Sequence, residues 1–182
     1  MSKHRPVEAL ADLERVLRRL KVREIDGLEK ALLEARRIFV TGLGRTGLMA
    51  RGFAMRLMHL GRTVYHVGDV ITPAIGPDDV LVICSRTGGS KMLGHYIDIA
   101  RRAKARVAVI TARPTSPVGR RADVVVSIDD RPLRRRRTRP PLPLGSLFEQ
   151  ALLITLDHVV LDLMTALNLG EADLARIHTD FE

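Results

Sequence analysis

The sequence of 182 residues has little of several features that would define a function class by themselves. It has one cysteine, no tryptophan, two tyrosines and four phenylalanines. A single cysteine excludes an internal disulfide, so we expect a cytoplasmic protein. No apolar run approaches the roughly 18 to 20 residues of a membrane-spanning helix, and the charged N-terminal stretch lacks the apolar centre of a secretory signal. We therefore expect no membrane partner.

The net charge of +9 is distributed unevenly along the chain. Six arginines and no acid fall within residues 131–139, RPLRRRRTR, and the rest of the chain is nearly balanced. Basic charge favours polyanions, so an RNA- or polyanion-binding protein that uses this arginine run is one hypothesis. The scarcity of aromatic side chains, on which unpaired bases stack, argues against nucleic acid. Phosphate on a small molecule and an acidic surface on another subunit stay open as partners.

Short apolar runs alternate with helical patterns along most of the chain. Strands are expected at 37–42, 63–68, 80–85, 106–111 and 123–128. From apolar spacings of three and four, helices are expected at 7–20, 24–36, 46–60, 90–103, 146–170 and 171–178. Nearly continuous apolar strands joined by helices predict a parallel sheet that is covered on both faces. The expected fold class is α/β, a flavodoxin-like three-layer α-β-α sandwich with a five-stranded parallel sheet.

A single domain over residues 1–182 accounts for this pattern. Residues 1–36 form N-terminal helices, 37–128 the sheet core and 146–182 the C-terminal helices. The intervening residues 129–145 are rich in proline and arginine and cannot form a regular helix. The helix that follows is apolar around much of its circumference, which indicates burial on more than one side and predicts contact with another subunit.

Two loops follow strands at the place where ligands bind in doubly wound sheets, beyond the carboxyl ends of the strands. The first, TGLGRTG at 41–47, carries Gly44, Arg45 and Thr46 at the start of a helix. It lacks the third glycine and the acidic partner of a dinucleotide fingerprint. Main-chain amides at a helix N-terminus and an arginine still favour an anion. The structural alternative is a tight turn with Thr46 as the helix N-cap.

The second loop, residues 85–90, is called the hydroxyl loop below. Ser85, Thr87 and Ser90 supply hydroxyl groups, and Gly88 lets the backbone approach a ligand closely. Hydroxyls and amides at a helix start suit a phosphate monoester. The alternative is that Ser90 merely caps the next helix. Cys84, just before this loop, is expected to be a buried strand residue rather than a catalytic thiol.

Several segments occur in a characteristic order along the chain: RIFVTGLGRTG, FAMRLMHLG, VGD with a following TP, the hydroxyl loop, PLGSLFE and IHTDFE. From about residue 36 to the C-terminus they resemble the 6-phospho-3-hexuloisomerases of the sugar isomerase (SIS) domain superfamily. The resemblance implies interconversion of 3-hexulose 6-phosphate and fructose 6-phosphate in the ribulose monophosphate pathway. It also implies a homotetramer with active sites between subunits, and neither a metal nor an organic cofactor.

The resemblance makes the hydroxyl loop the phosphate site, with two departures from the family pattern. Where the family usually reads S-G-S-G-E-T, this chain reads S-R-T-G-G-S. The three hydroxyl positions are kept, while Arg86 replaces a glycine and Gly89 replaces an acid. We expect Arg86 either to strengthen anion binding or to fill the pocket and alter the substrate.

Moving a ketone from C3 to C2 requires a base for the C2 proton and acids that shuttle protons between the two oxygens. The resemblance assigns Glu149 as the base and His59 and His178 as proton shuttles, with His178 reaching into a neighbour's site. The residues alone also permit plainer roles. Ser146 and Glu149 match a capping box, His59 suits the last turn of a helix, and His178 suits a solvated tail.

A further hypothesis is a non-catalytic SIS-type module that binds a phosphosugar and acts as a regulator. Such a sensor requires the phosphate loops but not Glu149 together with His59. The presence of both therefore favours the isomerase over the sensor, and the arginine run is more typical of a solvated or interface loop than of a nucleic-acid site.

Overall fold

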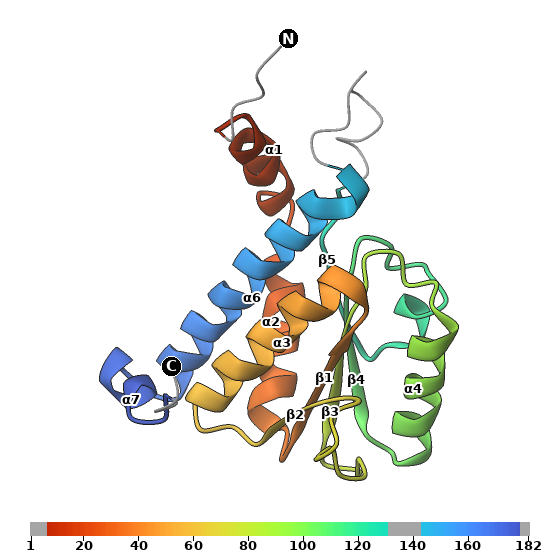
Figure 1. Ribbon diagram of the computed structural model, residues 1–182, viewed down its shortest axis with the longest axis vertical. Helices are drawn as coiled ribbons and strands as arrows, with labels where there is room; N and C mark the ends of the chain where they lie inside the picture. Colours follow the sequence, from red (N-terminus) through yellow and green to blue (C-terminus); the bar gives the residue numbers. More distant parts are fainter. Residues whose placement is uncertain (1–6, 131–142, 179–182) are drawn as a thin grey trace.

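The computed structural model describes residues 7–130 and 143–178, and the arginine run lies outside these described residues. Five parallel strands form one sheet in the order β2-β1-β3-β4-β5 (Figure 1). Their bounds are β1 (Ile38–Gly42), β2 (Val64–His66), β3 (Val80–Cys84), β4 (Arg106–Thr111) and β5 (Val124–Ser127). The predicted α/β class, the five parallel strands and the flavodoxin-like strand order are confirmed.

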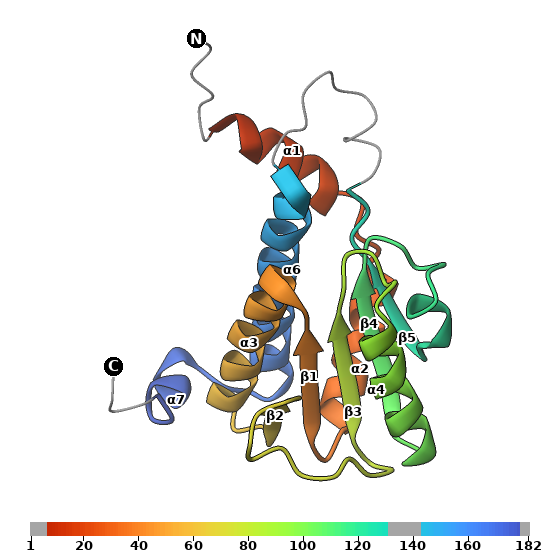
Figure 2. The ribbon, with the colours of Figure 1, turned by 45° about the vertical axis from the view of Figure 1, so that its right-hand side comes forward.

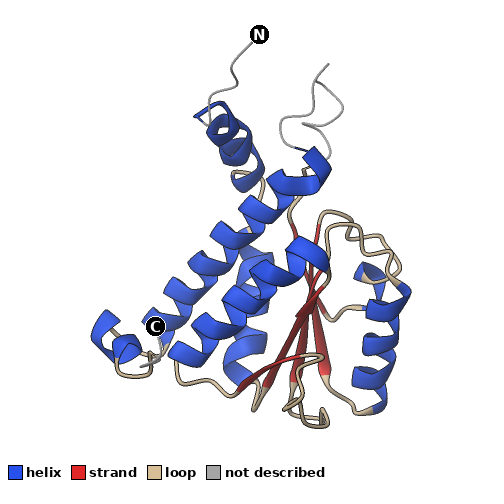
Figure 3. Ribbon diagram, viewed as in Figure 1, coloured by secondary structure: helices blue, strands red, loops and turns tan. Residues whose placement is uncertain are grey.

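Helices cover both faces of the sheet (Figure 3). They are α1 (Val7–Leu17), α2 (Val22–Glu34), α3 (Gly44–His59), α4 (Lys91–Arg102), α6 (Ser146–Ala166) and α7 (Glu171–Ala175), with the 3-10 turns η1 (Gly119–Arg121) and η2 (Pro143–Gly145). One face packs against α2, α3 and α6, whereas α4 is the α-helix on the other face. None of the described helices is both long enough and apolar enough to span a membrane.

The strands show why the chain forms this sandwich. All five residues of β3 are buried, as expected for a central parallel strand with helices on both sides. Successive side chains point to opposite faces of a strand. Val40 and Val82 accordingly join the core beneath α2, α3 and α6, while Phe39 and Leu81 join the core beneath α4.

Strand order reverses at β1, which pairs with β2 on one side and with β3 on the other. Gly42 at the end of β1 lies opposite Cys84 at the end of β3. The loops after these two strands therefore open next to each other at one edge of the sheet (Figure 2). This edge is the switch point at which the sequence predicts a ligand.

The long helix α6 is buried along much of its length against α1, α2 and α3. Phe148, Leu152 and Val159 are completely buried in this core. Ile154 and Leu161 nevertheless remain 43% and 59% exposed. An apolar surface is thus left on α6 in the single chain, as the sequence predicts for a helix that packs against more than one partner.

Candidate active site

The loop after β1 is a tight turn into α3. Gly44 has φ +56° in the left-handed region, and a Cβ at Gly47 would come within 2.6 Å of the Gly42 carbonyl oxygen. The helix begins at Gly44 with Leu43 as its N-cap. The interpretation of Thr46 as the N-cap is therefore wrong, because the N-cap lies three residues earlier, at Leu43. Thr46 is buried within the first turn.

The hydroxyl loop is held by its own side chains and by the loop after β4. Ser85 is buried, and its Oγ accepts a hydrogen bond from the Gly88 amide at 3.2 Å. Gly88 has φ +60°, and a Cβ there would lie 1.9 Å from Ser116 Oγ. Only glycine fits this position, because any side chain would combine a left-handed backbone with a collision.

The amino end of α4 presents unused donors. Ser90 Oγ accepts from the Leu93 amide at 3.4 Å, so the capping role of Ser90 is confirmed. Within the described chain, the amides of Thr87, Gly89 and Ser90 donate to no protein acceptor. Thr87 is exposed at the same place. Unpaired amides and a hydroxyl at the positive end of a helix dipole form an arrangement suited to a phosphate.

Arg45 crosses from α3 to the start of α6. Its Nη1 donates to Ser146 Oγ at 3.1 Å, and its Nη2 lies 2.8 Å from Glu149 Oε2. The N-cap of α6 is Gly145, with φ +98°, so the capping box predicted from Ser146 and Glu149 is wrong. The helix starts one residue after the glycine, and Ser146 and Glu149 are both available to the arginine.

The Glu149 carboxylate is almost fully buried, with 11% of its side chain exposed. Although Arg45 forms an ion pair with it, the contact lacks hydrogen-bond geometry. Within the described residues Oε2 accepts no hydrogen bond. A buried carboxylate oxygen beside a cation, and without a donor, remains able to accept a proton from a ligand. Arg45 lies at the amino end of α3, and Ser146 and Glu149 of α6 pack against it there. We call this group of three residues the carboxylate end of α3.

His59 and His178 meet at the other end of α3, although 119 positions separate them in the sequence. Their rings stack with centroids 5.0 Å apart and planes inclined by 30°. His59 is 3% exposed, whereas His178 lies on the surface. Figure 1 shows α7 near the carboxyl end of α3, which it contacts. We call this pair the histidine end of α3.

The structure does not bring the two ends together within one chain. The 16-residue helix α3 carries Arg45 in its first turn and His59 as its last residue. At about 1.5 Å per residue, this helix separates the two by roughly 20 Å. The ten predicted site residues therefore fall into two groups. The carboxylate end lies with the loops after β1 and β3, and the two histidines lie apart from them.

The side chain of Arg86 points away from the hydroxyl loop and towards Asp130. Its Nε and Nη2 donate to the two carboxylate oxygens of Asp130 at 2.9 and 3.2 Å. Asp130 is completely buried. The sequence analysis missed this pair because no local pattern relates two residues in different loops. The one available signal was a pair of acids, Asp129 and Asp130, shortly after the last strand.

Two further observations limit the chemistry of the described chain. Burial raises the pKa of Cys84 to about 12, so this thiol stays protonated and is no nucleophile at neutral pH. No three His, Cys, Asp or Glu side chains gather to form a metal site in residues 7–130 and 143–178.

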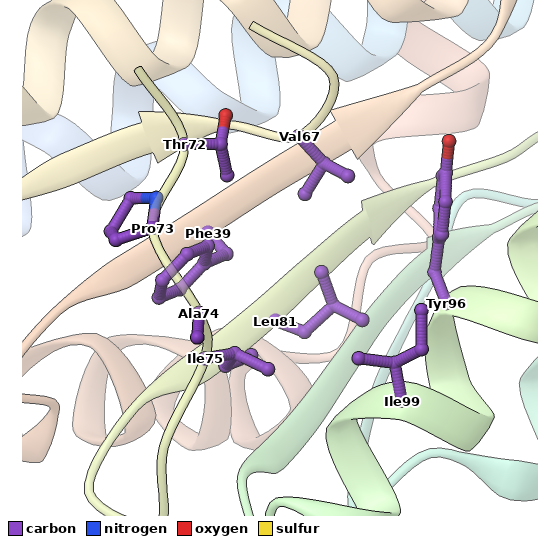
Figure 4. Close-up of a pocket in the computed structure, with 9 residues that line it drawn as sticks. All are labelled: Phe39, Val67, Thr72, Pro73, Ala74, Ile75, Leu81, Tyr96 and Ile99. Atoms are coloured by element: carbon purple, nitrogen blue, oxygen red, sulfur yellow. The ribbon is translucent and has the colours of Figure 1, made fainter. Parts of the chain in front are cut away.

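A separate cavity of about 170 Å³ lies between α4, β1, β3 and the segment after β2 (Figure 4). Its walls include Phe39, Leu81 and Ile99, and the Tyr96 and Thr72 hydroxyls are its polar groups. None of the lining residues carries a charge. The cavity therefore lacks a charged partner for an anion, and it is distinct from the switch-point edge.

Comparison with known proteins agrees with this geometry. The family model for the SIS domain matches residues 31–133. The chain belongs to the SIS domain family. A relative from Bacillus subtilis, named 3-hexulose-6-phosphate isomerase, is 37% identical to this SIS chain over 161 residues, 87% of each protein. A relative of the same name from Mycobacterium gastri is 35% identical over 156 residues, 85% of this chain and 78% of the relative.

A solved structure extends the similarity over the whole SIS chain. It is the crystal structure of the hypothetical protein MJ1247 from Methanococcus jannaschii, for which a molecular function of 3-hexulose-6-phosphate isomerase was inferred. It superimposes with a TM-score of 0.85 at 28% identity and covers 97% of this chain and 98% of that one. The predicted membership of the SIS superfamily is confirmed.

Proposed function

We propose that this SIS protein is a sugar-phosphate isomerase that interconverts 3-hexulose 6-phosphate and fructose 6-phosphate, in the cytoplasm and in the ribulose monophosphate pathway. The observation that carries the proposal is the Glu149 carboxylate, buried beside Arg45 with Oε2 free of hydrogen bonds among the described residues. Relatives named 3-hexulose-6-phosphate isomerase, similar over most of the chain, support the choice of substrate.

The hydroxyl loop binds the phosphate in this proposal. The amides of Thr87, Gly89 and Ser90 and the Thr87 hydroxyl face it at the amino end of α4, where the helix dipole favours an anion. Ser85 and Gly88 hold the loop in shape. Gly44 and the first turn of α3 form the adjacent wall, and Arg45 adds a positive charge.

Glu149 is the base. It removes the C2 proton of 3-hexulose 6-phosphate, and the electron pair of that C–H bond forms the double bond of a 2,3-enediolate. A proton then returns to C3, and the hydroxyl proton on O2 leaves as O3 gains one. This leaves the ketone at C2. Arg45 beside the carboxylate favours the negative charge that develops on the enediolate oxygens.

His59 and His178 shuttle the protons between O2 and O3, and they come from a second copy of the chain. Within one copy, α3 holds the histidine end roughly 20 Å from Arg45, too far for one sugar to touch both. Packing the histidine end of one subunit against the carboxylate end of another completes the site. We propose that such shared sites lie within a homotetramer.

The surface of α3 and α6 supports association with a second copy. Leu48 and Met55 are 60% and 40% exposed and lie seven residues apart on α3, so they share one side of the helix. Ile154 and Leu161 have the same spacing on α6, which packs alongside α3. Two parallel apolar rows of this kind are typical of a subunit interface rather than of a free surface.

Solvent exchange tests the reaction directly. Purified protein is incubated with fructose 6-phosphate in heavy water, and deuterium at C3 is followed by NMR together with formation of 3-hexulose 6-phosphate. We expect both signals from the wild type and from Glu34→Gln, which changes an exposed glutamate on α2. Neither signal is expected from Glu149→Gln.

The regulatory sensor predicts a different outcome of the same experiment. A sensor binds fructose 6-phosphate, as calorimetry detects, but leaves its C3 hydrogen unexchanged. Binding without exchange in the wild-type protein would overturn the isomerase and support the sensor. Exchange that persists in Glu149→Gln would keep the isomerase but remove Glu149 as its base.

A further inference from the structure

Arg86 occupies the position at which the 6-phospho-3-hexuloisomerase pattern has glycine, and its main chain is fastened to the neighbouring strand. The carbonyl oxygen of Arg86 accepts from the Ala112 amide at 3.2 Å and from Thr111 Oγ1 at 3.4 Å. Both donors lie at the carboxyl end of β4. The backbone of Arg86 is therefore part of the fixed edge of the sheet.

The side chain of Arg86 leads away from the hydroxyl loop to Asp130. The two hydrogen bonds of 2.9 and 3.2 Å form a bidentate pair, which fixes orientation as well as distance. Asp130 is 0% exposed, and the Arg86 side chain is 19% exposed. A buried carboxylate without its partner is costly, so the guanidinium is held firmly in this place.

The same side chain packs against the residue that precedes α6. A Cβ on Gly145 would lie 2.8 Å from Arg86 Cδ and 3.2 Å from its Nε. Gly145 has φ +98°, which favours glycine independently of this contact. Arg86 therefore occupies the space beside Gly145, and Glu149 follows in the first turn of the helix that starts there.

We propose that Arg86 is a positioning residue for the isomerisation: it fixes the start of α6, and thereby Glu149, relative to the hydroxyl loop that holds the phosphate. The inference rests on the proposed function. Arg45 and Arg86 then have different roles. Arg45 touches the carboxylate itself, whereas Arg86 acts through Asp130 and the Gly145 backbone.

Steady-state kinetics of Arg86→Ala separate positioning from ligand binding. We expect kcat to fall about 10- to 100-fold and KM to change less than about threefold, because the phosphate donors stay while the base loses its fixed position. Arg86→Lys should recover part of kcat. Arg101→Ala is the control, since Arg101 on α4 makes a bidentate pair with Asp123 at 2.8 and 3.0 Å that is more exposed and does not contact Gly145. It should leave both constants unchanged.

A double variant separates positioning from folding. Arg86→Ala leaves Asp130 buried and unpaired, which lowers stability by itself. Combining it with Asp130→Asn removes the buried charge, so the urea midpoint should rise towards that of the wild type while kcat stays low. Recovery of kcat to the wild-type value in the double variant would overturn the proposal. A large rise in KM at unchanged kcat would also overturn it, because Arg86 would then be a phosphate ligand.

A crystal structure of Arg86→Ala gives an answer that does not depend on turnover. The proposal predicts a displacement of residues 145–149 relative to the hydroxyl loop by about 1 Å, enough to matter for a base. An unmoved helix start would contradict it. If the wild-type protein shows no isomerisation, the proposed function fails, and this comparison still decides whether Arg86 positions Glu149.

Discussion

The two ends of α3 differ in how they are built. At the carboxylate end, Arg45 binds Ser146 and Glu149 from a helix that starts about 100 residues later, and the neighbouring hydroxyl loop has amides that are unpaired among the described residues. At the histidine end, His59 is buried and His178 lies over it on the surface. The first end has a carboxylate and hydrogen-bond donors that suit an anion, and the second end has two imidazoles.

This difference indicates what each end lacks. The carboxylate end holds a buried carboxylate and an arrangement suited to phosphate, but no imidazole among its described residues. The histidine end holds two stacked imidazoles, but no built anion site among the described residues. A reaction that needs all of these groups requires two copies of the chain, which is the basis of the following predictions.

The largest expected effect comes from separating the copies. Leu48→Lys places a charge in the exposed apolar row of α3 and should yield monomers without measurable turnover, since each monomer contains only the two incomplete ends. Sedimentation and the isomerase assay, on the same sample, check this. Val22→Lys is the control, because Val22 is 75% exposed at the start of α2 and belongs to neither end of α3. A fully active Leu48→Lys monomer would contradict the shared site.

Removal of the base is expected to be the next largest effect. Glu149→Gln keeps the size of the side chain but cannot take a proton, so kcat should fall about 1000-fold with KM nearly unchanged. Initial rates across a range of fructose 6-phosphate concentrations measure both constants. A rise in KM alone would mean that Glu149 binds the sugar but does not act as the base.

The histidine end should contribute less. His178→Ala is expected to lower kcat about 100-fold, because a proton shuttle is lost while the base remains. His178 lies on the surface, so the urea midpoint should change little. His95→Ala, at an exposed position on α4, is the matched control. Unchanged kcat in His178→Ala would assign this end a structural role.

The smallest expected effect concerns Glu29, which influences the folding stability but belongs to neither end of α3. Burial, with a hydrogen bond and charge from Asp162, raises the pKa of Glu29 to about 7 from its ordinary value of 4.5. The folded chain keeps this proton in a pH range where the unfolded chain has released it, so stability falls as the pH rises from about 4.5 to 7.

Glu29→Gln should remove that loss. Its urea midpoint should exceed that of the wild type above pH 7, and the two should converge near pH 4.5. Equal midpoints at pH 8 would contradict the raised pKa. Turnover should be unaffected, since Glu29 on α2 belongs to neither end of α3.

The strands of the sheet could be predicted from the sequence because a strand buried on both faces is a nearly continuous run of apolar residues. The buried apolar runs of β3 and β4 predicted these strands to within a residue. The ends of helices were harder to predict. Gly145 rather than Ser146 caps α6, since a left-handed glycine ends the preceding turn one residue before the serine.

The ion pairs across the candidate site could not be predicted from the sequence, because no local pattern of residues indicates them. The loop after the first strand suggested Arg45 as an anion partner and the family resemblance named Glu149, but their ion pair joins the first turns of two helices far apart in the chain. The Arg86–Asp130 pair was missed for the same reason, and Arg86 alone suggested either stronger anion binding or a side chain that fills the pocket. Charged side chains select partners by three-dimensional proximity, so their pairing depends on the fold rather than on neighbouring residues.

Subunit complementation tests the central claim most directly. Glu149→Gln and His178→Ala are each purified, dissociated, mixed in equal amounts and reassembled. Mixed oligomers then contain some sites with Glu149 from one parent and His178 from the other, and we predict recovery of about a quarter of the wild-type rate. A mixture that forms mixed oligomers but is no more active than its two parents would contradict an active site shared between subunits.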